Sequence, residues 1–416
     1  MQKEKWSLKK YGYAPVIIGL CFLMIFVCLG FCSSNKSIYL VPITEALDIK
    51  RSMFSMSDSI RFITTAVVNM FFGTLVNKFG TKKLIGAGFL SLIICMLCYA
   101  FSNQVWGFWI GSFFLGMGLS WTTTTMVGCV VNRWCKEKHG TIMGAILAAN
   151  GLGSAIATQI VSPIIYEEGN AFGYRNAYKL IVLILLVAGG LMMLLYKEKP
   201  AETAMLDKWK KSKESEKDAA EVKRPTYFYL VAVCVFLTGF VLQGIGGISS
   251  AHMKDVGLDA SYISTMVSFH ALALAGFKFL SGFLYDKFGL RVITIVCDVA
   301  SIVAVLSLAF VSSTPQGMIL AFVYAVISSL ALPLETVMLP IFTRSLFDKR
   351  AYNKILGVIV SINTAGYALG APVMNWAYET TGSYQKVLLM CCLVMLLVTV
   401  CFQYIISIAG KEGNRK

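Results

Sequence analysis

Apolar stretches of about twenty residues recur along the whole of this 416-residue chain. At about 1.5 Å per residue, a helix of this length crosses the roughly 30 Å hydrocarbon core of a bilayer. Because hydrophobic residues make up 57% of the sequence and charged residues only 14%, we expect a membrane protein. The twelve predicted spans are Tyr13–Ile38, Ser55–Val76, Leu84–Phe101, Trp106–Val131, Thr141–Ile164, Ala177–Tyr196, Tyr227–Ser249, Ser261–Tyr285, Val292–Val311, Gly317–Phe342, Ile355–Tyr378 and Tyr384–Ile408.

An internal repeat relates the two halves of the chain. The segment GTLVNKFGTKKL from Gly73 recurs 209 residues later as GFLYDKFGLRVI from Gly282, and each copy closes an apolar span. Such repeats are typical of transporters whose site lies between the halves. We therefore predict a six-helix half (1–196), a charged cytoplasmic linker (197–224) and a second six-helix half (225–416).

Positive charge is concentrated in alternate loops. Of the 37 Lys and Arg residues, 28 lie in the termini and in the loops on the same side, whereas 6 lie in the opposite loops. The positive-inside rule then predicts a plasma (inner) membrane protein with both termini in the cytoplasm. This asymmetry and the attraction of anionic lipid explain the net charge of +15, so we expect no nucleic acid partner.

The sequence offers little support for catalysis. Most of the 12 cysteines lie inside apolar spans, where they act as small apolar residues, and no His or carboxylate completes a metal site beside them. We find no arrangement of nucleophile or paired acids and no nucleotide-binding P-loop. We therefore expect neither an enzyme nor a resident metal or cofactor, and we expect a monomer.

The two repeated loops resemble those of the major facilitator superfamily, and the resemblance covers essentially the whole chain. It implies an all-α membrane protein with twelve transmembrane helices in two pseudo-symmetric six-helix bundles. It also implies that the loops latch the halves in one of two rocking states. Asn77 stands where the family has an acid, which Asp286 keeps, so a weaker charged latch is expected in the first half. The matched gating-loop residues are Gly73, Asn77, Gly80, Lys82, Gly282, Asp286, Gly289 and Arg291.

Four shorter segments resemble the monocarboxylate porter and oxalate:formate antiporter branch. They are NKSIYLVPITEAL, LVNKFG, NRWCKEKHGTIMG and GYRNAYKL. The resemblance makes Lys36 a cavity lysine and places Lys278 where the branch carries an arginine. Leu274 replaces an aspartate of mammalian-type members. Asn363 lies in the region where oxalate carriers have a second cation, which argues against a dianionic substrate.

The residues themselves indicate a similar site. Ionisable groups inside spans cost about 2.5 to 3.5 kcal/mol each on insertion scales, so each one calls for a partner or a function. The five that matter here are Lys36, Arg61, His270, Lys278 and Glu335. Arg61 and His270 are repeat partners, because each lies 12 residues, or about 18 Å, before its loop glycine. We expect Lys36, Arg61 and Lys278 to hold a carboxylate, and Glu335 or His270 to couple transport to a proton.

Four of these five residues also have a purely structural interpretation. Lys36 and Lys278 lie near enough to the ends of their spans to reach the head groups. Arg61 can pair with Asp58 three residues earlier in its own helix. His270 can be an interior histidine with satisfied hydrogen bonds.

Uncharged polar groups complete the predicted cavity. Thr122 and Thr125 share one face of the fourth span, where their hydroxyls can bond either a substrate or their own helix carbonyls. Asn363 can bond either a substrate or a neighbouring helix.

The sequence thus predicts a secondary active transporter of small organic monocarboxylates that works by proton symport or anion exchange through alternating access. Its expected partners are a small carboxylate, protons and the lipid bilayer. An oxalate:formate-like or other small-anion antiporter is the alternative within transport. A membrane sensor without net flux is the alternative from another class.

Overall fold

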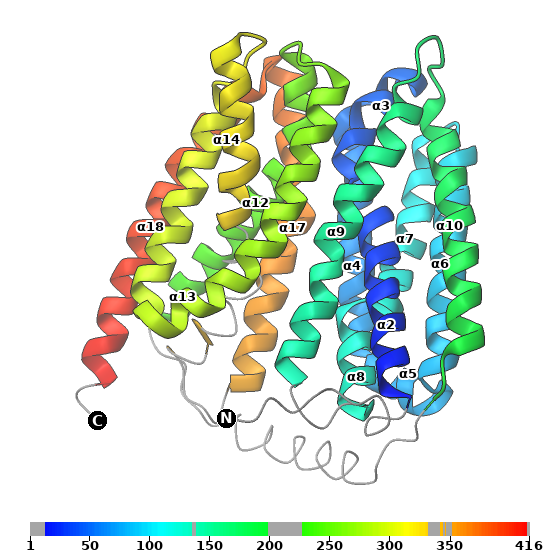
Figure 1. The fold of residues 1–416 in the computed structure, drawn as a ribbon. Coiled ribbons are helices and arrows are strands. Elements are labelled where there is room, and N and C mark those ends of the chain that lie inside the picture. Colours follow the sequence, from blue (N-terminus) through cyan, green and yellow to red (C-terminus); the bar gives the residue numbers. More distant parts are fainter. Residues whose placement is uncertain are drawn as a thin grey trace, which may run out of the picture.

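The computed structural model describes residues 13–134, 139–198, 227–331, 342–343, 346 and 352–413. Every regular element in these ranges is helical, which confirms the all-α prediction for this part of the chain. Figure 1 shows two bundles of steeply inclined helices side by side, one from each half of the sequence. All but the first 2 residues of the predicted linker lie outside the described residues.

Eleven described elements form the first half and five form the second. The first half contains α2 (Ala14–Ile25), the π-helix η1 (Phe26–Phe31), the 3-10 helix η2 (Lys36–Tyr39), α3 (Leu40–Leu47), α4 (Arg51–Met70), α5 (Phe72–Phe79), α6 (Thr81–Phe101), α7 (Val105–Thr122), α8 (Thr124–Trp134), α9 (His139–Ile165) and α10 (Gly173–Leu195). The second half contains α12 (Phe228–Asp255), α13 (Ala260–Ala309), α14 (Pro315–Ala331), α17 (Tyr352–Thr381) and α18 (Tyr384–Gly413). Each of the twelve predicted spans falls on one or more of these helices.

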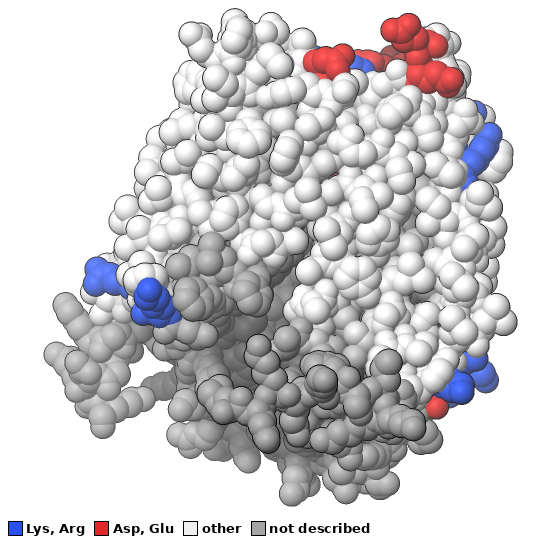
Figure 2. Space-filling model, in the orientation of Figure 1, with Lys and Arg blue, Asp and Glu red and all other residues white. Residues whose placement is uncertain are grey.

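The outer surface suits lipid. Nine helical stretches within the described ranges are long and apolar enough to cross a membrane. Large apolar side chains point outwards, such as Leu194 (82% exposed) and Met390 (68%), and Figure 2 shows few charges between the two ends of the molecule. Because lipid is the expected neighbour of this belt, its exposure costs nothing in the membrane. The molecule is therefore built as a multi-pass membrane protein.

α4 is not among those nine stretches, and its composition explains why. Its 20 residues, RSMFSMSDSIRFITTAVVNM, include three charged residues and four serines. Polar residues inside a span face the protein interior or a water-filled cavity. The low hydropathy of α4 therefore marks it as a helix that lines a site.

The repeated loops share one unusual backbone conformation. Gly80 between α5 and α6 has φ 79° and ψ 164°, and Gly289 within α13 has φ 75° and ψ 176°. Side chains with a Cβ rarely adopt this region, so glycine is required at both turns. Gly289 divides α13 into the two spans that the sequence predicts there. The two joints are thus equivalent in geometry as well as in sequence.

The chain defines two sides of the membrane. We call the side with Tyr13, Gly80 and Gly289 the terminal side, because the described chain begins there and α18 ends there (Figure 1). We call the opposite side, where α4 begins and α12 ends, the distal side.

Candidate functional site

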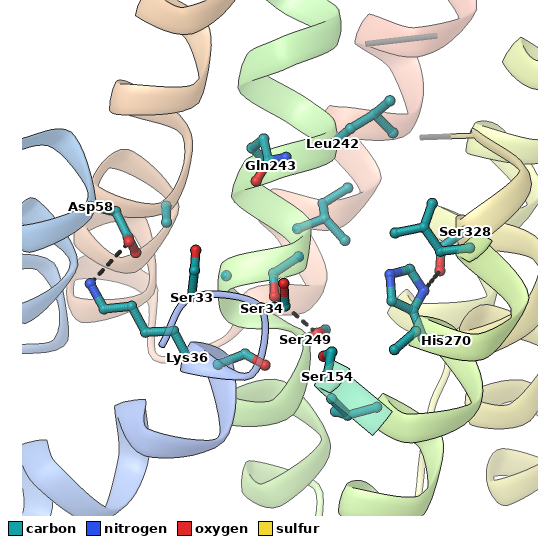
Figure 3. A pocket seen from close by; sticks show the side chains of 18 of the residues that line it. Ser33, Ser34, Lys36, Asp58, Ser154, Leu242, Gln243, Ser249, His270 and Ser328 are labelled. Carbon is teal, nitrogen blue, oxygen red and sulfur yellow. Dashed lines mark hydrogen bonds and ion pairs between the residues drawn. The ribbon is translucent and has the colours of Figure 1, made fainter. Parts of the chain in front are cut away.

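A cavity of about 320 Å³ lies between the two halves. The broken first span, α4 and α9 line it from the first half, and α12, α13, α14 and α17 line it from the second. Figure 3 shows Lys36 and Asp58 on one side of this space and His270 and Ser328 on the other. The polar side chains that line it include Ser33, Ser34, Lys36, Asp58, Arg61, Asn150, Gln243, Ser249, His270, Tyr324 and Ser328.

The first span unwinds where it meets the cavity. The sequence predicts one helix from Tyr13 to Ile38, but residues 32–35 form a turn between η1 and η2, and the helical path then continues to Leu47. The hydroxyl of Tyr166 donates to the carbonyl of Ile38 (3.0 Å), and burial raises the pKa of this hydroxyl, so it stays protonated. Broken helices at mid-membrane are characteristic of transporter binding sites, because they expose backbone and polar groups to the substrate.

A close backbone contact fixes this turn against α9. A Cβ atom on Gly30 would lie 2.5 Å from the carbonyl carbon of Gly153, and a Cβ on Gly153 would lie 2.2 Å from the Phe26 oxygen. Only glycine permits such an approach on both helices. The turn that carries Ser33 and Ser34, and Lys36 directly after it, are therefore held at a defined depth.

Lys36, Asp58 and Arg61 form a cluster that we call the cavity triad. Lys36 Nζ donates to Asp58 Oδ1 (2.9 Å) and to Ser57 Oγ (2.6 Å). Arg61 Nε lies 3.5 Å from the same Asp58 oxygen, and its NH1 donates to Ser33 Oγ (3.1 Å). Arg61 thus pairs with Asp58 and also lines the cavity, so its structural and its substrate-binding interpretations are compatible.

The cavity triad carries one uncompensated positive charge. Its side chains are only 13% (Lys36), 19% (Asp58) and 15% (Arg61) exposed, so water screens them weakly. Lys36 also lies over the ring of Phe54 (5.4 Å) and Arg61 over that of Phe62 (3.9 Å). Two cations and one carboxylate in a partly desolvated wall attract an anion, which would complete the charge balance.

The opposite wall is polar and bears no fixed charge among its described lining residues. His270 Nδ1 lies 3.1 Å from the carbonyl oxygen of Ala325 and 2.9 Å from Ser328 Oγ. A carbonyl oxygen can only accept, so Nδ1 is assigned as a protonated nitrogen. Gln243 and Tyr324 line the same side. This wall can donate and accept hydrogen bonds beside an anion held by the cavity triad.

On the distal side the halves are joined by a set of polar contacts that we call the distal latch. Arg51 donates twice to Asp255, through NH1 to Oδ2 (2.5 Å) and through NH2 to Oδ1 (2.8 Å). The backbone nitrogen and hydroxyl of Ser52 donate to Glu379, both at 2.8 Å. Further pairs across the halves are Lys254 with Glu45, Asn375 with Ser55, Ser250 with Ser37, Ser59 with the Ala368 carbonyl, and Ser162 with Ser264.

The cavity is therefore closed towards the distal side. Arg51 and Ser52 begin α4, and their partners Asp255 and Glu379 lie at the distal ends of α12 and α17, so these contacts join the halves on the distal side of the cavity. A site between two bundles that is sealed on one side corresponds to one state of an alternating-access cycle.

Three other predicted residues lie away from the cavity. Thr122 is fully buried and its hydroxyl donates to the Gly118 carbonyl of its own helix (2.8 Å). Thr125 is exposed and lies on α8, because the predicted fourth span is interrupted between α7 and α8. Asn363 is 2% exposed and packs against Gly239 of α12, where a Cβ would lie 2.5 Å from its Oδ1. For Thr122 the structure shows the intrahelical alternative.

Two predicted site residues fall outside what the structure describes. Glu335 lies outside the described residues, as does the side chain of Lys278. In the gating loops, the side chain of Asp286 is likewise outside them, whereas Asn77 and Arg291 are exposed.

The carboxylate of Glu198, which follows α10, contacts the end of the first repeated loop. Glu198 Oε1 accepts from the backbone nitrogen of Thr81 (2.6 Å), at the start of α6, and lies 4.0 Å from Arg133 NH1. A carboxylate at a helix N-terminus interacts favourably with the helix dipole. Glu198 thus provides, after α10, an acid beside the loop in which Asn77 has none.

Sequence reasoning missed Asp58 as a cavity residue. Its spacing from Arg61 indicates a pair within one helix, and nothing local to it shows that Lys36 of another element shares the same oxygen. The serines of residues 33–37 were also missed, although a cluster of small polar residues at the end of an apolar stretch is a signal for a break.

The family model described as Major Facilitator Superfamily matches residues 20–245 and 231–415. The uncharacterised transporter YcxA of Bacillus subtilis is 25% identical over 257 residues, which are 61% of this chain and 60% of that protein. The sialic acid transporter NanX of Escherichia coli is 22% identical over 313 residues, or 74% and 71%. A nitrite extrusion protein of Bacillus subtilis is 25% identical over 145 residues, or 35% of each chain.

Among solved structures, the nucleoside transporter NupG with one substituted residue superposes with a TM-score of 0.74 at 13% identity, over 94% of this chain and 99% of that one. At this identity the likeness shows the fold alone. The predicted fold of two six-helix bundles is confirmed as the major facilitator fold. With a family match over nearly the whole sequence, the chain belongs to the major facilitator superfamily and is a multi-pass membrane transporter.

Proposed function

We propose that this protein is a secondary active transporter of small organic monocarboxylates, working by proton symport or anion exchange through alternating access. The observation that carries the proposal is the net single positive charge of the cavity triad. A monocarboxylate would bring the charge of the described cavity side chains to zero, whereas a neutral solute would leave a cation uncompensated.

Two features support the anion as substrate. Arg61 and Lys36 reach the cavity from different elements, so a carboxylate between them can accept from both. Two relatives are named for transport of sialic acid and extrusion of nitrite, and both of these solutes are small anions at neutral pH. The narrower resemblance to the monocarboxylate branch remains a prediction, as do Lys278 as a further cation and Glu335 or His270 as the proton-coupling group.

The direction of the molecule in the membrane is part of the proposal. The charge asymmetry of the loops puts the terminal side in the cytoplasm of the plasma (inner) membrane. The cavity sealed by the distal latch then corresponds to an inward-facing state.

The test is uptake of labelled lactate, pyruvate and formate into proteoliposomes, with and without an inward proton gradient. Accumulation driven by the gradient supports symport, and uptake that requires internal anion supports exchange. Lys36→Gln should reduce uptake strongly, and Lys386→Gln, on an exposed lysine of α18, is the matched control. No flux of any of the three acids, in either format, would overturn the proposal.

Two alternatives give different results in the same assay. Another small anion, such as oxalate, exchanging in place of these acids would favour the small-anion antiporter. Binding of lactate to purified protein without any counterflow would favour a membrane sensor.

A further inference from the structure

We propose that Asp58 determines the charge of the ligand that the cavity accepts, because its carboxylate cancels one of the two cavity cations and thereby selects monoanions over dianions. The inference rests on the proposed function in taking an organic anion as the substrate. It adds a specificity-determining residue and the class of ligand that this residue rejects.

The geometry places Asp58 between the two cations. One oxygen, Oδ1, accepts from Lys36 Nζ at 2.9 Å and lies 3.5 Å from Arg61 Nε. Figure 3 shows the Lys36–Asp58 pair at the edge of the cavity. Among the described residues that line this space, Asp58 is the one acid. No other described lining residue can therefore offset the cations.

Among the described lining residues, the charge balance then depends on Asp58 alone. With Asp58 ionised, the described cavity side chains sum to one positive charge, so a monoanion leaves none and a dianion leaves one negative charge in a poorly screened space. With a neutral side chain at position 58, they sum to two positive charges, and a dianion becomes the ligand that completes the balance.

The other titratable groups near the triad do not change this count at neutral pH. Cys95 lies near Lys36 and Arg61, and Tyr99 lies near Asp58. Thiols and phenols are ordinarily neutral at pH 7. His270 faces the cavity from α13 and is ordinarily neutral above about pH 7.5. Measurements at pH 8 therefore isolate the contribution of Asp58.

The geometry also predicts a compensated pair of variants. Lys36→Gln alone lowers the cavity charge to zero, so binding of a monoanion should be lost. Adding Asp58→Asn to Lys36→Gln restores a single positive charge on Arg61, so binding of a monoanion should return.

The experiment measures thermal stabilisation of the purified protein by lactate and by malonate, two three-carbon acids, at pH 8. This readout reports binding without turnover. The wild-type protein should prefer lactate by about tenfold in apparent affinity, and Asp58→Asn should prefer malonate by about the same factor. Asp58→Glu should keep the wild-type preference. Glu168→Gln, which removes an exposed carboxylate outside the cavity, should leave it unchanged.

A lactate preference retained in folded Asp58→Asn would overturn the inference. If that variant does not fold, the paired variants decide: recovery of lactate binding in Lys36→Gln/Asp58→Asn supports the inference, and a double variant as inactive as Lys36→Gln overturns it. In both cases lactate binding by the wild-type protein leaves the proposed function standing. A wild-type protein stabilised by neither acid and transporting no monocarboxylate would instead remove the proposed function itself.

Discussion

The two walls of the cavity occupy equivalent positions in the repeat but differ in chemistry. Arg61 on α4 and His270 on α13 are 209 residues apart and both line the cavity. Arg61 belongs to a charged cluster with Asp58 and Lys36, whereas His270 bonds to Ala325 and Ser328. The two halves therefore share an equivalent arrangement of helices. Their side chains differ, so that one wall carries charged groups and the other carries neutral hydrogen-bonding groups.

The strongest test of this difference is Arg61→Gln. We expect uptake of the transported anion to fall about 100-fold or more, because breaking a buried charge cluster costs on the order of 3 kcal/mol and leaves Lys36 fully committed to Asp58. The measurement is initial uptake into proteoliposomes, normalised to the amount of folded protein. Arg61→Lys keeps the charge without the planar donors and should recover only part of the activity. Wild-type uptake by Arg61→Gln would show that the charged wall does not bind the substrate.

A second test asks whether the walls move apart at their distal ends. Arg51→Asp places two acids together in the distal latch, since Arg51 donates twice to Asp255. Loss of one bidentate pair at a partly exposed site is worth about 1 kcal/mol, so we expect about a fivefold gain in the state open to the distal side. Labelling of a cysteine at Ser55, in a variant without other cysteines, by an impermeant thiol reagent reports this opening.

The control for this variant is the charge exchange Arg51→Asp/Asp255→Arg, which should restore the low labelling of the starting protein. Equal labelling in all three proteins would mean that the latch does not hold the walls together.

The helical spans of the molecule were predictable from the sequence, whereas the residues that line its cavity were predictable only in part. Apolar length and the loop repeat fix the spans because each span must satisfy its backbone hydrogen bonds within itself. The break at residues 32–35 was not predicted, although its serines signal one, and the contact of Gly30 with Gly153 that positions it against α9 is a tertiary event. The sequence predicts Asp58 as a partner of Arg61 alone, because the approach of Lys36 from another element is a tertiary event. Thr122 lies on a polar face of its helix, yet that face packs against α6 near Gly88 instead of lining the cavity.

The uncharged wall gives a smaller expected effect. His270→Gln keeps a side chain that can donate to the Ala325 carbonyl, but it removes the ring and any proton that the ring carries. We expect a two- to fivefold loss of uptake, consistent with one neutral hydrogen bond whose net contribution is about 0.5 to 1 kcal/mol. The comparison with Arg61→Gln at equal protein amount is the measurement. A loss as large as that of Arg61→Gln would mean that both walls contribute equally to transport and would contradict the proposed difference between them.

The smallest effect is expected beyond the walls, at Thr122. Its hydroxyl donates to the Gly118 carbonyl and the side chain is fully buried, so Thr122→Val should change uptake by less than about twofold while removing one hydrogen bond worth about 1 kcal/mol. Uptake and thermal unfolding of the same preparation separate the two effects, and Thr123→Val, which loses a similar bond to the Leu119 carbonyl, is the matched control. A large loss of uptake with unchanged unfolding in Thr122→Val alone would mean that the substrate site extends into the fourth span, as the sequence predicts. The charged wall would then not be the limit of the site on that side.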